Sequence, residues 1–326
     1  MARLGVVGAG SWGTALAIVA TRAGHAVTLW GRDPHQIADM TVQRRNARYL
    51  PEAELPAALT PTATFADLHG SDALLLVVPA QQVRSVCREL PALPIPLVIC
   101  AKGLERATGL RLSQVVLAER PGTEVAVLSG PSFALEVAQG LPTAVTIAAT
   151  AKPLAQSLAE LLAGPSFRPY PSDDLLGVEL AGALKNVVAI AAGVTMGKGL
   201  GENARASLIT RGLAELARLA SALGARRETL MGLAGLGDLL LTATSRTSRN
   251  TSFGYALAAG RRAAELLAAG QKLSEGAFTA EAACHLGRRT GVELPIAEAV
   301  RAVIAGETSV DAAIEALLAR PLALSE

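Results

Sequence analysis

Near the start of the chain, residues 8–13 read Gly8-Ala9-Gly10-Ser11-Trp12-Gly13. An apolar, strand-like run at 3–7 precedes them, and a run rich in helix-forming residues follows at 14–20. This glycine spacing is common by chance, but between a strand and a helix it is typical of dinucleotide binding. Gly8 permits a tight turn, Gly10 lets backbone N–H groups approach a pyrophosphate, and Gly13 lets the helix pack closely on the strand. Because the helix N-terminus adds N–H donors for phosphates, we predict a dinucleotide site here.

From residue 3 to about residue 170, strand-like apolar runs alternate with helical patterns. The predicted strands cover 4–7, 26–30, 73–78, 97–100, 125–128, 144–148 and 167–170, and helical segments between them include 80–90, 110–118 and 153–162. Such alternation predicts an α/β fold with a Rossmann-type, doubly wound, mostly parallel sheet. Residues beyond 174 show only helical patterns punctuated by glycine. We therefore expect a dinucleotide-binding domain at 1–178 and an all-α substrate-binding and catalytic domain at 179–326.

Composition excludes several classes of function. Lys+Arg and Asp+Glu nearly balance, at 30 against 28, with no basic block, so we expect no nucleic-acid partner. The three cysteines lie far apart among apolar neighbours, which is typical of the reducing cytoplasm. The histidines form no His-x-x-x-His pair, so we predict no catalytic metal. The apolar run 178–196 could span a bilayer by length, but Glu179, Lys185 and Asn186 within it argue against membrane insertion.

The end of the second predicted strand bears on the choice of nicotinamide cofactor. In an NADH site, an acidic residue there binds the ribose 2′-hydroxyl. In this chain Gly31 is followed by Arg32, whose guanidinium could stack on adenine and pair with a 2′-phosphate. Asp33 could instead bind the hydroxyl, and both side chains could simply lie in solvent. We predict NADPH as the cofactor, with NADH as the alternative.

Lys185 is the most informative side chain of the second half. It lies with Asn186 in an otherwise apolar helical segment, where burial of an unpaired ammonium is costly. Such a lysine is paired, neutral or beside a cavity, and desolvation lowers its pKa toward the range that proton transfer needs. The alternative is a lysine whose ammonium reaches solvent along its own alkyl chain.

Two other segments of the second half carry polar side chains. Asp238 lies beside glycines and could pair with a buried lysine or cap a helix. Ser248-Arg249-Asn250 combines a hydroxyl, a forked cation and an amide, a set that suits a phosphate. A solvated polar turn is the alternative for residues 248–250.

Two loops of the first half follow predicted strands. Lys102 comes after the strand at 97–100, and Ser129-Gly130-Pro131-Ser132-Phe133-Ala134 follows the strand at 125–128. Ligands of open α/β sheets bind outside the carboxyl ends of the strands. We therefore expect both loops to line the ligand cleft, with Lys102 well placed for an anionic ligand.

Several strings, spread in order over nearly the whole chain, form a set far more specific than the first glycine motif. They are GAGSWGTA at 8–15, KGLE at 102–105, LSGPSFA at 128–134, GALKNV at 182–187, LITRG at 208–212, GLAGLGDL at 232–239 and SRN at 248–250. In these strings the chain closely resembles the bacterial NAD(P)-dependent glycerol-3-phosphate dehydrogenases. The resemblance implies reversible reduction of dihydroxyacetone phosphate to sn-glycerol 3-phosphate, which supplies phospholipid synthesis.

The resemblance also implies roles for individual residues. Lys185 would exchange a proton with the C2 oxygen, Lys102 would hold and polarise the substrate, and Asp238 would fix Lys185 or the substrate hydroxyl. The implied substrate-binding residues are these three together with Gly130, Ser248, Arg249 and Asn250. The implied cofactor-binding residues are Gly8, Gly10, Ser11, Trp12, Gly13, Arg32, Tyr49, Lys102, Gly130, Ser132, Ala134, Arg249, Leu273 and Glu275.

Other protein classes share part of this pattern. A β-hydroxyacid dehydrogenase with the same two domains would also place Lys and Asn on the first helix of its second domain, but residues 248–250 favour a phosphorylated substrate. A non-catalytic NAD(P)-sensing regulator would have no need for Lys102, Lys185 and Asp238 together. UDP-sugar dehydrogenases need a cysteine nucleophile, and no cysteine lies in a candidate loop. The many apolar helices of the second domain lead us to expect a homodimer.

Overall fold

The computed structural model describes residues 1–268 and 274–320 of the chain, which form two compact units. The first unit comprises Met1–Ala101 and Arg111–Val178. The second comprises Lys102–Leu110 and the chain from Glu179 onward. The short segment Lys102–Leu110 therefore belongs to the helical unit, although it lies within the sequence range of the first.

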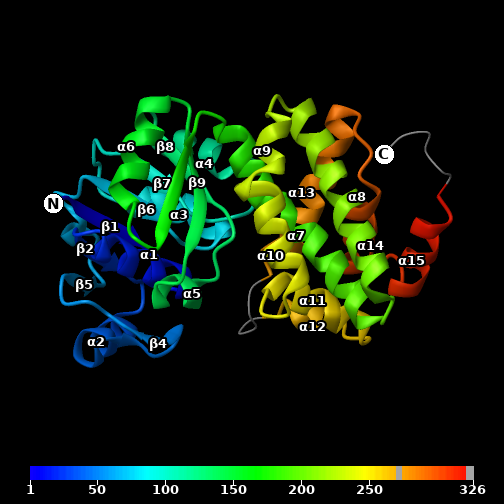
Figure 1. Cartoon of the computed structure of the whole chain (residues 1–326), viewed down its shortest axis with the longest axis horizontal. Helices are drawn as coiled ribbons and strands as arrows, with labels where there is room; N and C mark the ends of the chain where they lie inside the picture. Colours follow the sequence, from blue (N-terminus) through cyan, green and yellow to red (C-terminus); the bar gives the residue numbers. More distant parts are fainter. Residues whose placement is uncertain (269–273, 321–326) are drawn as a thin grey trace. The chain divides into compact units, whose positions relative to one another are not determined.

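An eight-stranded sheet forms the centre of the first unit (Figure 1). In order across the sheet, its strands are β10 (Phe167–Ser172), β9 (Thr143–Ala149), β8 (Val125–Ser129), β7 (Leu97–Ile99), β6 (Ala73–Leu76), β1 (Arg3–Val7), β2 (Ala26–Trp30) and β5 (Leu59–Thr62). All neighbouring strands run parallel except β8 and β9. The order from β5 through β1 to β8 is that of a Rossmann sheet, so the predicted α/β class is confirmed.

Helices pack on this sheet in two groups. The first group contains α1 (Ser11–Arg22), α5 (Ala134–Gln139) and α6 (Lys152–Leu162), which contact one another through α1. The second group is the pair α3 (Val83–Glu89) and α4 (Leu112–Glu119). Strands buried on both faces have no solvated side, which explains their continuous apolar runs.

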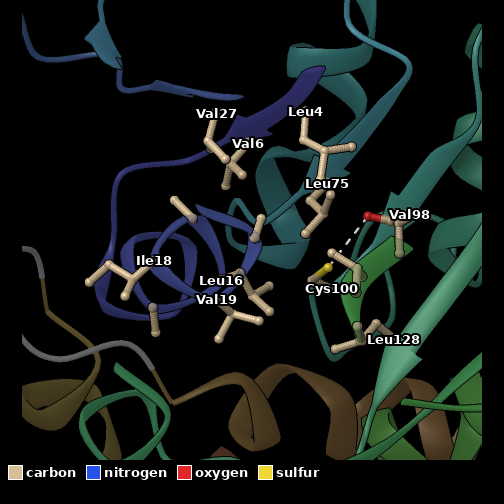
Figure 2. Packing of buried hydrophobic residues seen from close by; sticks show 14 of the residues in the cluster. Leu4, Val6, Leu16, Ile18, Val19, Val27, Leu75, Val98, Cys100 and Leu128 are labelled. Atoms are coloured by element: carbon tan, nitrogen blue, oxygen red, sulfur yellow. Dashed lines mark hydrogen bonds between the residues drawn. The ribbon is translucent and has the colours of Figure 1, made fainter. Parts of the chain in front are cut away.

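An apolar core of the first unit lies between α1 and the strands. Figure 2 shows Leu16 of α1 in the same cluster as Val6 of β1 and Leu75 of β6. Leu74 and Leu76 are equally buried but lie outside that cluster, because successive strand residues point to opposite faces. The glycine-rich turn between β1 and α1 is therefore anchored at both ends by packed elements.

The sequence pattern did not predict three of the strands, and it predicted one continuous helix where the structure has two elements. β5 was missed because it is only four residues long and contains Pro61, which an edge strand tolerates. β3 (Arg45–Asn46) and β4 (Leu50–Glu54) form a separate two-stranded hairpin after α2 (Pro34–Gln43). The helix expected at 80–90 is a 3₁₀ turn, Ala80–Gln82, followed by α3.

The second unit is helical, with α7 near its centre in Figure 1. Its helices are α7 (Leu175–Gly197), which begins in the first unit, α8 (Gly201–Ala222), α9 (Arg227–Met231), α10 (Asp238–Thr244), α11 (Arg249–Ala258), α12 (Ala263–Leu266), α13 (Glu275–Thr290), α14 (Pro295–Ala305) and α15 (Val310–Leu318). Among the described residues, α7 alone is long and apolar enough to cross a membrane. However, 89% of its most apolar window is buried inside the protein, as expected of a core helix.

The helices α7 and α11 cross at backbone contact. A Cβ atom on Gly254 of α11 would lie 1.9 Å from the carbonyl oxygen of Ile190 on α7, so only glycine fits there. Near the start of α11, Nδ2 of Asn250 donates a hydrogen bond of 2.9 Å to Oδ1 of Asn186. This packing holds the beginning of α11 beside the turn of α7 that carries Lys185.

Candidate active site

Two lysines of the second unit meet at one carboxylate. Nζ of Lys185 lies 2.7 Å from Oδ1 of Asp238, and Nζ of Lys102 lies 2.6 Å from Oδ2. Lys185 and Asp238 are buried, whereas the side chain of Lys102 is 19% exposed. Lys185 is therefore an interior, paired lysine, and the alternative of an ammonium reaching solvent does not hold.

Asp238 is the first residue of α10 and follows a single π-helical turn at Leu233–Gly237. One turn further along α10, Oγ1 of Thr242 accepts a hydrogen bond of 2.5 Å from Nζ of Lys185. The same hydroxyl donates to the carbonyl oxygen of Asp238 at 2.6 Å. Sequence reasoning did not single out Thr242. Its spacing of four residues from Asp238 was the available signal, because such residues share one face of a helix.

The charges of this cluster shift each other's pKa values. Burial lowers the pKa of Lys185 to about 8, because the interior disfavours its ammonium. The Asp238 carboxylate opposes this shift, while the cations of Lys102 and Arg249 add to it. Burial alone would raise the pKa of Asp238, but the two neighbouring ammonium groups outweigh burial and hold that pKa below its ordinary value. The cluster thus contains a stable carboxylate beside an ammonium that can give up its proton near neutral pH.

The N-terminus of α11 carries the predicted phosphate-binding residues. Oγ of Ser248 caps the helix by accepting a hydrogen bond from the backbone N–H of Thr251. Arg249 is exposed. Oδ1 of buried Asn250 accepts hydrogen bonds from Oγ of Ser274 and from the backbone N–H of Gly276. A helix N-terminus with an exposed guanidinium is suited to an anion.

The glycine-rich turn of the first unit has the shape that a pyrophosphate requires. A Cβ atom on Gly13 would lie 1.8 Å from the carbonyl oxygen of Gly8, so the helix meets the turn at backbone contact. A Cβ atom on Gly10 would meet nothing within 4 Å, so this part of the turn is open to a ligand. The buried Nε1 of Trp12 has no hydrogen-bond partner among the described residues. The turn therefore fits a bound dinucleotide.

At the end of β2, the two candidate residues play different parts. Oδ1 of Asp33 accepts hydrogen bonds from the backbone N–H groups of His35 and Gln36, at 3.0 and 3.4 Å, and so caps α2. Its Oδ2 lies 3.2 Å from a guanidinium nitrogen of Arg48. Arg32 is exposed. Asp33 is therefore a helix cap rather than one of two solvated side chains.

The remaining predicted site residues are distributed over both units. In the first unit, Oγ of Ser132 donates to the carbonyl oxygen of Gly130 at 2.9 Å, Ala134 begins α5, and Tyr49 is 42% exposed. In the second unit, Glu275 begins α13. Leu273 lies outside the described residues. Among the predicted site residues, the structure thus brings Lys102 and Lys185 together at Asp238 and bonds Ser11 to the backbone of Tyr49.

Comparisons with known proteins give the same family for both halves of the chain. Residues 3–155 match the N-terminal part of NAD-dependent glycerol-3-phosphate dehydrogenase, and residues 174–315 match its C-terminal part. Two relatives, the glycerol-3-phosphate dehydrogenases [NAD(P)+] of Methylobacterium radiotolerans and Azorhizobium caulinodans, are 55% and 53% identical to this chain. Each comparison covers 98% of this chain and 97% of the relative. The crystal structure of glycerol-3-phosphate dehydrogenase from Coxiella burnetii superimposes with a TM-score of 0.92 at 40% identity, covering 98% of this chain and 99% of that chain. The chain therefore belongs to the NAD-dependent glycerol-3-phosphate dehydrogenase family of oxidoreductases.

Proposed function

We propose that this chain catalyses the reversible NAD(P)H-dependent reduction of dihydroxyacetone phosphate to sn-glycerol 3-phosphate in the cytoplasm, where the product supplies phospholipid synthesis. The observation that carries the proposal is the contact of Lys185 and Lys102 with one buried carboxylate, Asp238. The names of the full-length relatives support the activity. Residues 1–178, apart from the segment Lys102–Leu110, serve as the dinucleotide-binding domain, and residues 179–326 together with that segment serve as the substrate-binding and catalytic domain.

The first unit holds the cofactor. The turn at Gly8, Gly10 and Gly13, with Ser11 and Trp12 at the start of α1, receives the pyrophosphate. Asp33, the alternative residue for a ribose hydroxyl, is engaged as the cap of α2. Arg32 therefore receives the 2′-phosphate of NADPH. When bound, the nicotinamide supplies the hydride that reduces the ketone carbon. The other residues proposed to contact the cofactor are Tyr49, Lys102, Gly130, Ser132, Ala134, Arg249, Leu273 and Glu275.

Lys185 supplies the proton. Negative charge develops on the ketone oxygen during reduction, and the ammonium of Lys185 donates a proton to it. Two of the three N–H donors of this ammonium are bonded to Asp238 and Thr242. The third has no acceptor among the described residues and can bond a substrate oxygen. Lys102, on the other oxygen of Asp238, polarises and holds the substrate. In the reverse reaction, the neutral amine of Lys185 accepts the hydroxyl proton.

The phosphate end of the substrate binds at the start of α11. Ser248, Arg249 and Asn250 bring a helix N-terminus and a guanidinium to this point. Gly130 is the remaining residue proposed to bind the substrate. This set distinguishes a phosphorylated ketone from the β-hydroxyacid substrates of dehydrogenases with a similar plan.

We also propose that the chain forms a homodimer through the helical unit, which exposes large apolar side chains such as Met231 and Leu240. Analytical ultracentrifugation at micromolar concentration measures this directly. A dimer mass is expected, and a monomer mass at every concentration would contradict the proposal.

The proposed activity is tested by following oxidation of NADPH and of NADH by the purified protein with dihydroxyacetone phosphate. Steady oxidation is expected, with a higher kcat/KM for NADPH. Addition of β-hydroxyacids with NAD+ or NADP+ is expected to give no reduction. Absence of turnover with both reduced cofactors would refute the activity.

For the phosphate site, we predict that Arg249→Ala raises the KM for dihydroxyacetone phosphate about 10- to 100-fold, since a hydrogen bond to a charged group is worth ~1.5–3 kcal/mol. The matched control is Arg246→Ala, because the Arg246 guanidinium lies 4.0 Å from the centre of the Tyr255 ring and has no role in the proposed site. Steady-state kinetics measures both variants. An unchanged KM in Arg249→Ala would remove Arg249 from phosphate binding.

A further inference from the structure

The hairpin β3–β4 brings a second arginine to the end of β2. The guanidinium of Arg48 pairs with Asp33, one residue beyond the exposed Arg32. The Arg48 side chain is 61% exposed, so its guanidinium stays accessible to a ligand while paired. The 2′ substituent of the cofactor ribose is recognised at this strand end in Rossmann folds. Two exposed guanidinium groups are therefore found where a 2′-phosphate would bind.

The hairpin is anchored to the glycine-rich turn on both sides of Arg48. On one side, Nδ2 of the fully buried Asn46 donates to the carbonyl oxygen of Ala9 at 3.0 Å and to Oγ1 of Thr14 at 2.8 Å. On the other side, Oγ of Ser11 donates to the carbonyl oxygen of Tyr49 at 2.7 Å. The backbone that carries Arg48 is thus fixed to the turn that receives the pyrophosphate. Such support gives a binding side chain a defined position.

We infer that Arg48 is a specificity-determining residue that binds the 2′-phosphate of NADPH together with Arg32. The inference rests on the proposed function for the identity of the cofactor. A phosphate dianion can compete with the Asp33 carboxylate for the Arg48 guanidinium, because both are acceptors that a guanidinium binds through paired hydrogen bonds. The 2′-hydroxyl of NADH is uncharged and gains no comparable contact, so Arg48 raises the affinity for NADPH alone.

The test compares Arg48→Ala with the wild type in two measurements. Calorimetry without substrate gives the Kd of 2′-phospho-ADP-ribose and of ADP-ribose, and steady-state kinetics gives kcat/KM for NADPH and NADH. We expect Arg48→Ala to raise the Kd of 2′-phospho-ADP-ribose and to lower kcat/KM for NADPH, each about tenfold. The Kd of ADP-ribose and kcat/KM for NADH should change less than about twofold. In Arg48→Lys, the affinity for 2′-phospho-ADP-ribose should lie between that of the wild type and that of Arg48→Ala, because lysine retains the positive charge but not the paired hydrogen-bond donors of a guanidinium.

Arg45→Ala is the matched control, since Arg45 is an exposed arginine of the same hairpin. A similar loss of affinity for 2′-phospho-ADP-ribose in Arg45→Ala would show a general effect of positive charge and would overturn the inference. The inference would also be overturned if Arg48→Ala lost equal affinity for 2′-phospho-ADP-ribose and for ADP-ribose, or if neither affinity changed. If the protein bound 2′-phospho-ADP-ribose through Arg48 but did not reduce dihydroxyacetone phosphate, the proposed function would fail while the assignment of Arg48 would stand.

Discussion

Lys185→Ala is expected to lower kcat for reduction of dihydroxyacetone phosphate by about 10²- to 10⁴-fold, the range for loss of a general acid. Lys185 is buried, and its Nζ is held by Asp238 and Thr242, so alanine removes a proton donor that has a fixed position. NADPH is expected to bind with nearly unchanged Kd, because the glycine-rich turn lies in the other unit. Steady-state kinetics and calorimetric titration with NADPH measure the two effects.

The matched control for this variant is Lys198→Ala. Lys198 follows the end of α7 and pairs with Asp311 at 2.6 Å on the surface, so its loss should leave kcat unchanged. Lys185→Met is a second variant that keeps most of the side-chain volume if alanine impairs folding. Turnover near that of the wild type in folded Lys185→Ala or Lys185→Met would remove Lys185 from the mechanism.

Asp238→Asn is expected to lower kcat/KM for reduction at neutral pH by about 10²- to 10³-fold, within the range for loss of electrostatic stabilisation. The asparagine keeps the size of the side chain but removes the charge that opposes the desolvation of Lys185. The pKa of Lys185 should then fall below about 8, and the proton donor is lost at neutral pH. The pH profile of kcat/KM measures this effect, as the fall in reduction rate should move to lower pH.

Asp311→Asn controls for the general effect of removing an aspartate from a lysine pair, because the Asp311 side chain is 69% exposed. Loss of one partner from a buried ion pair typically costs about 3–5 kcal/mol, so thermal unfolding should be followed in parallel. A folded Asp238→Asn variant with an unshifted pH profile would contradict the role of Asp238 in tuning Lys185.

Much of the fold could be predicted from the sequence, because its strands are strongly patterned. β1, β2 and β8 are short apolar runs followed by glycine-containing turns, and a strand buried on both faces has to be apolar throughout. β5 and the hairpin β3–β4 escaped prediction because Pro61 and the polar residues 45–54 obscure a strand pattern. The reversal between β8 and β9 also escaped, since direction depends on the connection rather than on the strands themselves.

The candidate site could be predicted in part. Lys185 was identifiable because a charge in an apolar helix needs a partner, and Asp238 was a stated candidate for that partner. The association of Lys102 with the helical unit was not predictable, because it depends on the path of a nine-residue segment that no periodic pattern describes. The anchoring role of Asn46 was equally hidden, since its partners Ala9 and Thr14 lie more than thirty residues away in the sequence.

The claim that Lys185 exchanges the proton is tested most directly by the pH dependence of kcat/KM in both directions. Reduction needs the ammonium of Lys185, so its rate should fall as pH rises through about 8. Oxidation of glycerol 3-phosphate needs the neutral amine, so its rate should rise through the same pH. Profiles that are flat around pH 8 in both directions, or that change in the same sense, would contradict the account.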